Sequence, residues 1–145
     1  MKDFDALTHL QACAVPYRLV RGRVEVCLVT TLKSRRWIFP KGFVEPHESP
    51  PAAALKEAWE EAGLMGRIVG ERLGTYVRRK PRCELHVSCY LMLVEEVRER
   101  WNESHLRRRR WMTIAEAHAQ LHHVAHRDLL TLAARLLEMS RTQAG

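Results

Sequence analysis

The acidic side chains of this 145-residue chain are concentrated between Pro40 and Leu64, although the chain as a whole has a formal net charge of +7. Glu57, Glu60 and Glu61 are spaced i, i+3 and i+4, which places their carboxylates on one face of a helix. Carboxylates this close repel one another, and a divalent cation such as Mg²⁺ relieves the repulsion while also binding phosphate oxygens. The pattern is typical of either a solvated acidic helix face or a metal site that acts on phosphates.

A helix over residues 50–62 is predicted to carry these three glutamates. Ser49 can cap its first turn, Pro50 suits the first helical position, and Gly63 can end it. A short apolar strand at 37–39 is expected before it, and the loop between strand and helix contains two more glutamates. Because strand, loop and helix converge on one spot, the metal-site interpretation is favoured.

The remaining segments predict one mixed sheet with further helices, hence an α/β or α+β fold in a single domain over residues 1–145. No linker or repeat interrupts the chain. Residues rich in β-formers or alternating in polarity predict strands at 12–20, 24–30, 67–77, 84–95 and 107–112. A capping box and an amphipathic pattern predict helices at 113–121 and 125–139.

The residues from Gly42 to Leu64 resemble the Nudix box, G-x5-E-x7-R-E-U-x-E-E-x-G-U. The match runs Gly42, five residues, Glu48, seven residues, and then KEAWEEAGL at 56–64. Lys56 stands where the family usually has arginine, so the charge is kept but the planar fork that braces two carboxylates is lost. The resemblance implies an α/β/α sandwich around a mixed β-sheet, and an enzyme that hydrolyses diphosphate bonds with Mg²⁺ or Mn²⁺.

The resemblance also implies roles for individual residues. Glu57 and Glu61 are expected to bind the metal directly, with Glu60 as a third ligand or as the base that acts on water. A backbone carbonyl near Lys41 or Gly42 is expected to complete the metal shell. The expected supporting residues are Lys56, which would orient the glutamates, and Gly42, Glu48 and Gly63, which would be structural.

Segments outside the box, such as WIFPKGFVEPHES and RRRRWMTIAEAHAQL, resemble the branch that holds diphosphoinositol polyphosphate phosphohydrolases and diadenosine polyphosphate hydrolases. The expected partner is therefore a phosphate-rich small molecule held by a basic rim, because guanidinium groups bind phosphate strongly. Strand alternation predicts that Arg107 and Arg109 point one way and that Arg108 and Arg110 point the other. The rim candidates are Arg18, Lys33, Arg36, Lys41, Arg78, Arg79, Arg107 and Arg109.

Two other functions are compatible with the same residues. A nucleotide house-cleaning enzyme or an RNA 5′-end pyrophosphohydrolase would use the same positive field, so nucleic acid is an alternative partner. A non-catalytic binding module would usually have lost box glutamates, whereas this chain keeps all four. His118, His122 and His126 recur every four residues, but they lack a convergent third ligand of the usual kinds and are expected to be exposed polar residues.

The composition sets the expected surroundings of the protein. The chain has no apolar run of membrane-spanning length and no signal-peptide pattern at its N-terminus, so a cytoplasmic protein without a membrane partner is expected. A monomer or a homodimer is expected. The four cysteines lack CxxC spacing and are expected to be buried free thiols.

Overall fold

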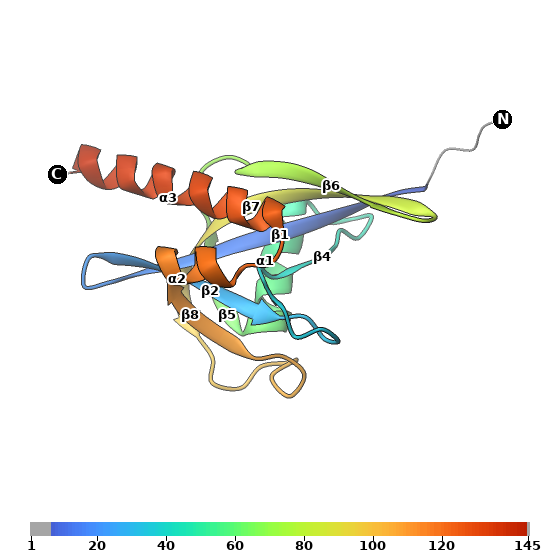
Figure 1. Ribbon diagram of the computed structural model, residues 1–145, viewed down its shortest axis with the longest axis horizontal. Helices are drawn as coiled ribbons and strands as arrows, with labels where there is room; N and C mark the ends of the chain where they lie inside the picture. Colours follow the sequence, from blue (N-terminus) through green and yellow to red (C-terminus); the bar gives the residue numbers. More distant parts are fainter. Residues whose placement is uncertain (1–6, 145) are drawn as a thin grey trace.

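Two long strands form the centre of the molecule in the computed structural model, which describes residues 7–144 and the side chains as far as Ser140. β1 (Leu7–Val20) and β7 (Cys83–Val97) pair in parallel, from Leu7 opposite Cys83 to Tyr17 opposite Leu93 (Figure 1). Much of both strands is buried, because helices cover both faces of the sheet.

Shorter strands complete one eight-stranded mixed sheet. They are β2 (Arg23–Thr30), β3 (Trp37–Ile38), β4 (Lys41–Phe43), β5 (Leu64–Ile68), β6 (Gly74–Lys80) and β8 (Arg109–Thr113). β4 pairs with residues 11–13 of β1 and β2 pairs with residues 17–20, both antiparallel and both on the edge opposite β7. Pro16, which has no N–H to donate, lies where β1 changes from one partner to the other.

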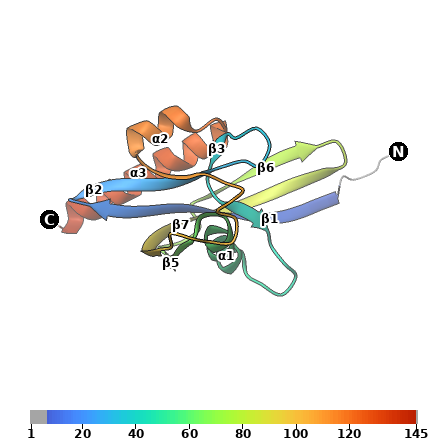
Figure 2. The same cartoon turned by 90° about the horizontal axis from the view of Figure 1, so that it is seen from below.

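Helices cover both faces of the sheet. Figure 2 shows α1 (Pro50–Ala62) on one side, and α2 (Ile114–Gln120) and α3 (Val124–Ala144) on the other. The α1 side packs through small residues, because four buried helix alanines (Ala53, Ala54, Ala58 and Ala62) meet Ala12 and Ala14 of β1. The opposite core holds larger side chains, including Leu28, Phe39 and Leu130. The expected α/β/α sandwich is confirmed.

The predicted helix over residues 50–62 is confirmed, together with its caps. The Ser49 side chain accepts a hydrogen bond from the Ala52 N–H, at 3.3 Å. Gly63 ends the helix with a φ of 66°, in the left-handed region that glycine adopts without strain. These local signals set where the acidic helix begins and ends.

One strand prediction was wrong, and one strand was not predicted. Residues 67–77 are not one strand but the end of β5 and the start of β6, separated by a turn in which Gly70 has a φ of 74°. The two strands pair with different parts of one edge of β7, a long-range choice that a run of β-forming residues does not reveal. β4 was not predicted, because three residues are too few to show a period.

Two expectations about side chains and membranes can also be compared with the structure. All four cysteines are free; Cys13, Cys27 and Cys89 are buried and Cys83 is half-buried. Across residues 7–144, no helix is both long and apolar enough to cross a bilayer.

His126 is fully buried, so the expectation that the three spaced histidines are exposed was wrong at this position. Its Nδ1 accepts a hydrogen bond from the Phe39 N–H at 3.2 Å, and its Nε2 lies 2.8 Å from the Tyr76 hydroxyl. Burial lowers the pKa of His126 to about 3, with smaller contributions from nearby cations. The neutral ring thus ties α3 to β6 and to the segment just before β4, whereas His118 and His122 are exposed.

This depressed pKa predicts a specific acid sensitivity. His126 is neutral in the folded protein down to about pH 3 but protonates near 6.5 when unfolded, so its contribution to stability is lost as pH falls from 6.5 toward 3. We expect His126→Gln to remove roughly 3 kcal/mol of this pH dependence between pH 8 and pH 4. Denaturant unfolding of wild type and variant between pH 4 and 8 measures it, and the exposed His118→Gln variant should retain the wild-type slope.

Candidate active site

The acidic face of α1 lies directly against β4. The Lys41 N–H donates a hydrogen bond to Glu61 Oε1 at 3.2 Å. A Cβ atom on Gly42 would overlap the carboxyl group of Glu57, so any larger residue at this position would displace that carboxyl group from β4. The structure therefore brings together Glu57, Glu61, Lys41 and Gly42, as the box resemblance predicted.

Glu61 and Glu57 are held in a site that disfavours their charged forms. Glu61 is 5% exposed, and burial raises its pKa to about 8; Arg107 opposes this shift, and Glu57 adds to it. Burial, followed by repulsion from Glu60, also raises the pKa of Glu57. Carboxylates crowded in this way have too little positive charge around them, which is the condition under which a divalent cation binds with most benefit.

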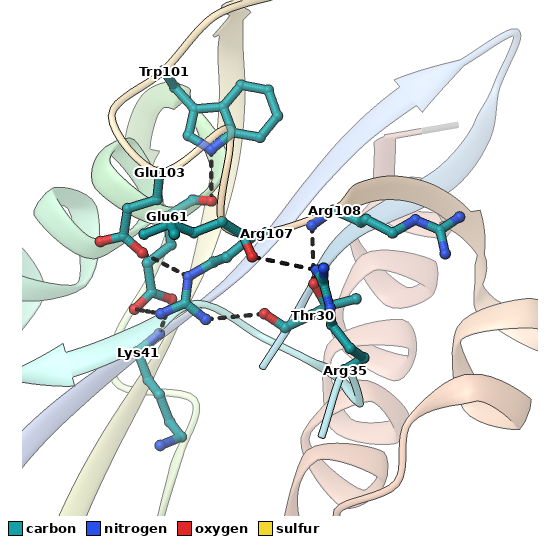
Figure 3. Close-up of polar contacts among 9 residues, drawn as sticks. Thr30, Arg35, Lys41, Glu61, Trp101, Glu103, Arg107 and Arg108 are labelled. Carbon is teal, nitrogen blue, oxygen red and sulfur yellow. Dashed lines mark hydrogen bonds and ion pairs between the residues drawn. The ribbon is translucent and has the colours of Figure 1, made fainter. Parts of the chain in front are cut away.

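A fourth carboxylate reaches the site from a segment that sequence analysis passed over. Glu103 lies on the loop at 98–108, and its N–H donates to the Glu60 carbonyl at 3.2 Å. Trp101 on the same loop donates from its indole nitrogen to the Glu61 carbonyl at 2.8 Å (Figure 3). The negative charge of Glu103 raises the pKa of both Glu57 and Glu61. No periodic pattern marks this loop, so only its docking on α1 identifies Glu103.

Arg107 lies inside this carboxylate group rather than on an open rim. Its Nε donates to Glu103 Oε1 at 2.7 Å, its Nη2 to Glu61 Oε2 at 3.3 Å, and its Nη1 to the Thr30 carbonyl at 3.0 Å (Figure 3). Only 11% of its side chain is exposed. The guanidinium is engaged by internal partners, and phosphate binding by Arg107 stays a prediction.

Arg109 also points toward α1, as strand alternation predicted. One of its nitrogens donates to the carbonyls of Ala62 and Arg98, each at 2.7 Å, and its guanidinium stacks 4.1 Å from the centre of the Trp101 ring. Arg108 points elsewhere and lies over Trp37. Arg109 therefore fixes the loop against the helix end and is not an open rim residue either.

Lys56 braces the loop that precedes α1. Its Nζ lies 3.0 Å from Glu48 Oε1, and the same oxygen accepts the Glu45 N–H at 2.9 Å. Glu48 and Lys56 thus hold the loop in place. The hydrogen bond of Lys56 goes to Glu48, away from the glutamates expected to bind metal.

A cluster of positive charge lies on the other face of β4. The Lys41 side chain points away from Glu61 (Figure 3), and burial followed by repulsion from Arg78 lowers the Lys41 pKa, with a smaller contribution from Lys80. We call Lys41, Arg78 and Lys80 the basic cluster. Gln11 of β1 lies on the same face of the sheet as the Lys41 side chain. Its partner on β4 is Phe43, and Lys41, two residues before Phe43, points to the same side.

The other rim candidates are not gathered there. Arg18 pairs with Glu25 at 2.8 Å and stacks on Trp111, Arg79 pairs with Glu84, and the Arg36 guanidinium lies 2.7 Å from the His122 ring. Lys33 is exposed in the turn after β2. Of the predicted rim residues, Lys41 and Arg78 lie near one another, and phosphate binding by the rim residues stays a prediction.

The donor set suits a hard cation. Within residues 7–144, no three His, Cys, Asp or Glu side chains are already gathered at metal-binding distances, so the carboxylates must adjust to hold an ion. Glu57 and Glu61 nevertheless place their carboxyl oxygens beside β4, with Glu60 and Glu103 close by. All these donors are carboxylate oxygens, which fits Mg²⁺ or Mn²⁺.

Comparison with known proteins decides the family. Residues 8–133 match the NUDIX domain model. The chain belongs to the Nudix family. It is 37% identical over 113 residues to Nudix hydrolase 4 of Arabidopsis thaliana, covering 71% of this chain and 54% of that protein. It is also 35% identical over 111 residues to diphosphoinositol polyphosphate phosphohydrolase 3-beta of Bos taurus, covering 73% of this chain and 66% of that protein.

Solved structures show that the Nudix fold is shared. The Ap4A hydrolase of C. elegans superposes with a TM-score of 0.76 at 23% identity, covering 90% of this chain and 99% of that chain. The NUDIX domain of Shewanella oneidensis NrtR, solved with ADP ribose, gives a TM-score of 0.75 at 21% identity, covering 92% and 90%. The match to the curated relatives spans only 54% and 66% of their own length.

The raised pKa of Glu61 predicts how the metal-free Nudix domain responds to pH. The folded protein holds a proton on Glu61 up to about pH 8 whereas the unfolded chain releases it near 4.5, so unfolding becomes easier as pH rises between these values. We expect Glu61→Gln to flatten that decline, measured by denaturant unfolding in EDTA from pH 5 to 9. The exposed Glu99→Gln variant is the control, and an unchanged slope in Glu61→Gln would contradict the assignment.

Proposed function

We propose that this chain is a Mg²⁺- or Mn²⁺-dependent hydrolase that cleaves a diphosphate bond in a highly phosphorylated small molecule, such as a diphosphoinositol polyphosphate or a diadenosine polyphosphate. One observation carries the proposal. The backbone of Lys41 and Gly42 contacts Glu61 and Glu57, while the Lys41 side chain joins Arg78 on the other face of the strand. Lys41 thus lies between carboxylates that would bind a cation and basic side chains that would bind phosphates. Relatives with such substrates in their names support the same substrate class.

The residues divide the work between holding the cation and moving a proton. When bound, the cation neutralises phosphate oxygens and lowers the pKa of a bound water. Glu57 and Glu61 would hold it, with a backbone carbonyl at Lys41 or Gly42 as a further ligand. Glu60 would be a third ligand or accept the proton of the attacking water. Lys56 and Glu48 would keep the preceding loop, and with it the start of α1, in place.

The basic cluster and the neighbouring Gln11 favour a substrate that carries hydrogen-bond donors as well as phosphates. Lys41 and Arg78 would bind phosphates that are not cleaved. Beside them, within the described part of the chain, Gln11 Oε1 is buried without a hydrogen-bond partner, a costly state unless a ligand supplies one. A fully ionised phosphate has no proton to donate, whereas hydroxyl or amino groups on the rest of the substrate do.

A second candidate is hydrolysis of a nucleotide, or of the 5′ end of RNA. Phe43 on β4 is 53% exposed, meets His9 edge-on at 6.0 Å, and lies on the same strand face as Lys41. An exposed aromatic ring beside a cation is suited to stacking a base. A Phe43→Leu variant tests base stacking, because it should impair turnover of any substrate that carries a base, diadenosine polyphosphates included, and leave an inositol substrate unaffected.

The activity is tested with a substrate panel. Diphosphoinositol phosphates, diadenosine polyphosphates, nucleoside triphosphates, ADP-ribose and 5′-triphosphorylated RNA are incubated with Mg²⁺ or Mn²⁺, and the products are separated and quantified. Free phosphate alone is not a sufficient readout, because cleavage of ADP-ribose or of a diadenosine polyphosphate gives two phosphate esters and no free phosphate. We expect turnover of at least one polyphosphate, reduced by at least about 100-fold in Glu57→Gln and Glu61→Gln because the cation loses a ligand. Glu99→Gln serves as the control. No turnover by the wild type, or full activity in both variants, would exclude the proposal.

The basic cluster has its own test. Lys41→Met keeps the backbone contact to Glu61 but removes the ammonium, and Arg78→Gln removes the guanidinium. Each is expected to raise KM for a polyphosphate about tenfold or more, because a charge-assisted hydrogen bond is lost. The exposed Lys33→Gln variant, with the same change of charge, should keep the wild-type KM. An unchanged KM in both cluster variants would move the phosphate site elsewhere.

A further inference from the structure

We infer that Arg107 is the positioning residue that joins the two acidic segments of the site, α1 through Glu61 and the loop at 98–108 through Glu103, and so takes the place of the arginine that the box lacks at Lys56. The inference rests on the proposed function in one respect, namely that these carboxylates serve a divalent cation. Arg107 would act through the glutamates and not on the substrate.

Lys56 does not perform this positioning role. Its ammonium group lies 3.0 Å from Glu48, a loop carboxylate, and its side chain is 34% exposed. A guanidinium at the same position could have held two carboxylates at once, because its donors form a rigid planar fork. Near Glu61, a positioning cation must therefore come from another segment.

Arg107 has the required geometry. Its three guanidinium nitrogens each donate to a different segment: Nε to Glu103 on the loop, Nη2 to Glu61 on α1, and Nη1 to the Thr30 carbonyl at the end of β2. With the Lys41 N–H on Glu61 Oε1 and Arg107 on Oε2, both oxygens of Glu61 are oriented. A lysine could not contact all three partners in this planar arrangement.

The surroundings of Arg107 keep it in place. Thr30 Oγ1 accepts the Arg108 N–H at 2.9 Å, and the Thr30 N–H donates to the Arg108 carbonyl at 3.1 Å, so the backbone beside Arg107 is tied to β2. On the other side, Trp101 and Arg109 attach the loop to the end of α1. A side chain whose backbone and partners are fixed in this way orients other groups at little entropic cost.

The experiment compares Arg107→Gln, Arg107→Lys and the matched control Arg110→Gln, a neighbouring arginine on β8 that is exposed. Three quantities are measured: the melting temperature in EDTA, the affinity for Mg²⁺ and Mn²⁺ by calorimetry without substrate, and kcat and KM separately. We expect Arg107→Gln to melt about 5 °C or more below the wild type. Its metal affinity and kcat should fall about 10- to 100-fold, with KM changed less than about threefold. Arg107→Lys should recover only part of each loss, and Arg110→Gln should match the wild type.

Other outcomes overturn the inference. A higher KM with unchanged metal affinity and melting temperature would make Arg107 a phosphate ligand. Tighter metal binding in Arg107→Gln would show that the Arg107 guanidinium repels the cation and does not position its ligands.

If the wild type neither binds a divalent cation nor cleaves any substrate, the proposed function fails, and the melting temperatures in EDTA still decide the role of Arg107. In that case Glu103→Gln should lower the melting temperature less in the Arg107→Gln background than in the wild type, because the pair is already broken. Fully additive losses would refute the coupling.

Discussion

The burial of one carboxylate, that of Glu61, is the constraint on which the site depends. A carboxylate that is almost removed from solvent costs free energy unless donors surround it, and here they come from β4 and from Arg107. These contacts still leave the pKa of Glu61 raised to about 8, so the surrounding donors only partly offset the cost of burying its negative charge. Fold and electrostatics are linked at this point, because the same contacts that attach α1 to β4 hold a carboxyl group whose charged form they only partly stabilise.

Small side chains make that close attachment sterically feasible. Alanines on α1 face alanines on β1, and Gly42 leaves the space into which the Glu57 carboxyl fits. Larger residues on this face would move the helix away from the strand and separate the glutamates from the backbone of β4. The opposite core is filled by bulky residues, and the neutral His126 beside it holds Phe39, two residues before β4. β4 follows β3 through residues 39 and 40, and His126 holds this connection by accepting the Phe39 N–H.

β4 separates two environments of opposite charge. Glu57 and Glu61 lie on one side and the basic cluster on the other, with Lys41 contributing its backbone to the first and its side chain to the second. The excess positive charge of the chain is not all located in the basic cluster. Arg18, Arg79, Arg107 and Arg109 all have acidic, carbonyl or aromatic partners within the protein. Much of the positive charge is therefore engaged by partners within the protein.

The sequence by itself determined the family, the fold class and the acidic helix with both caps, because these depend on residues within a few positions of one another. The spacing of Glu57, Glu60 and Glu61 follows from the helical period, and the opposite directions of Arg108 and Arg109 follow from the strand period. The tertiary structure alone decided that Glu103 and Arg107 join the site, that His126 is buried, and that residues 67–77 divide between two strands. Each of these depends on which distant segments pair or dock, and no local period in the chain records that choice.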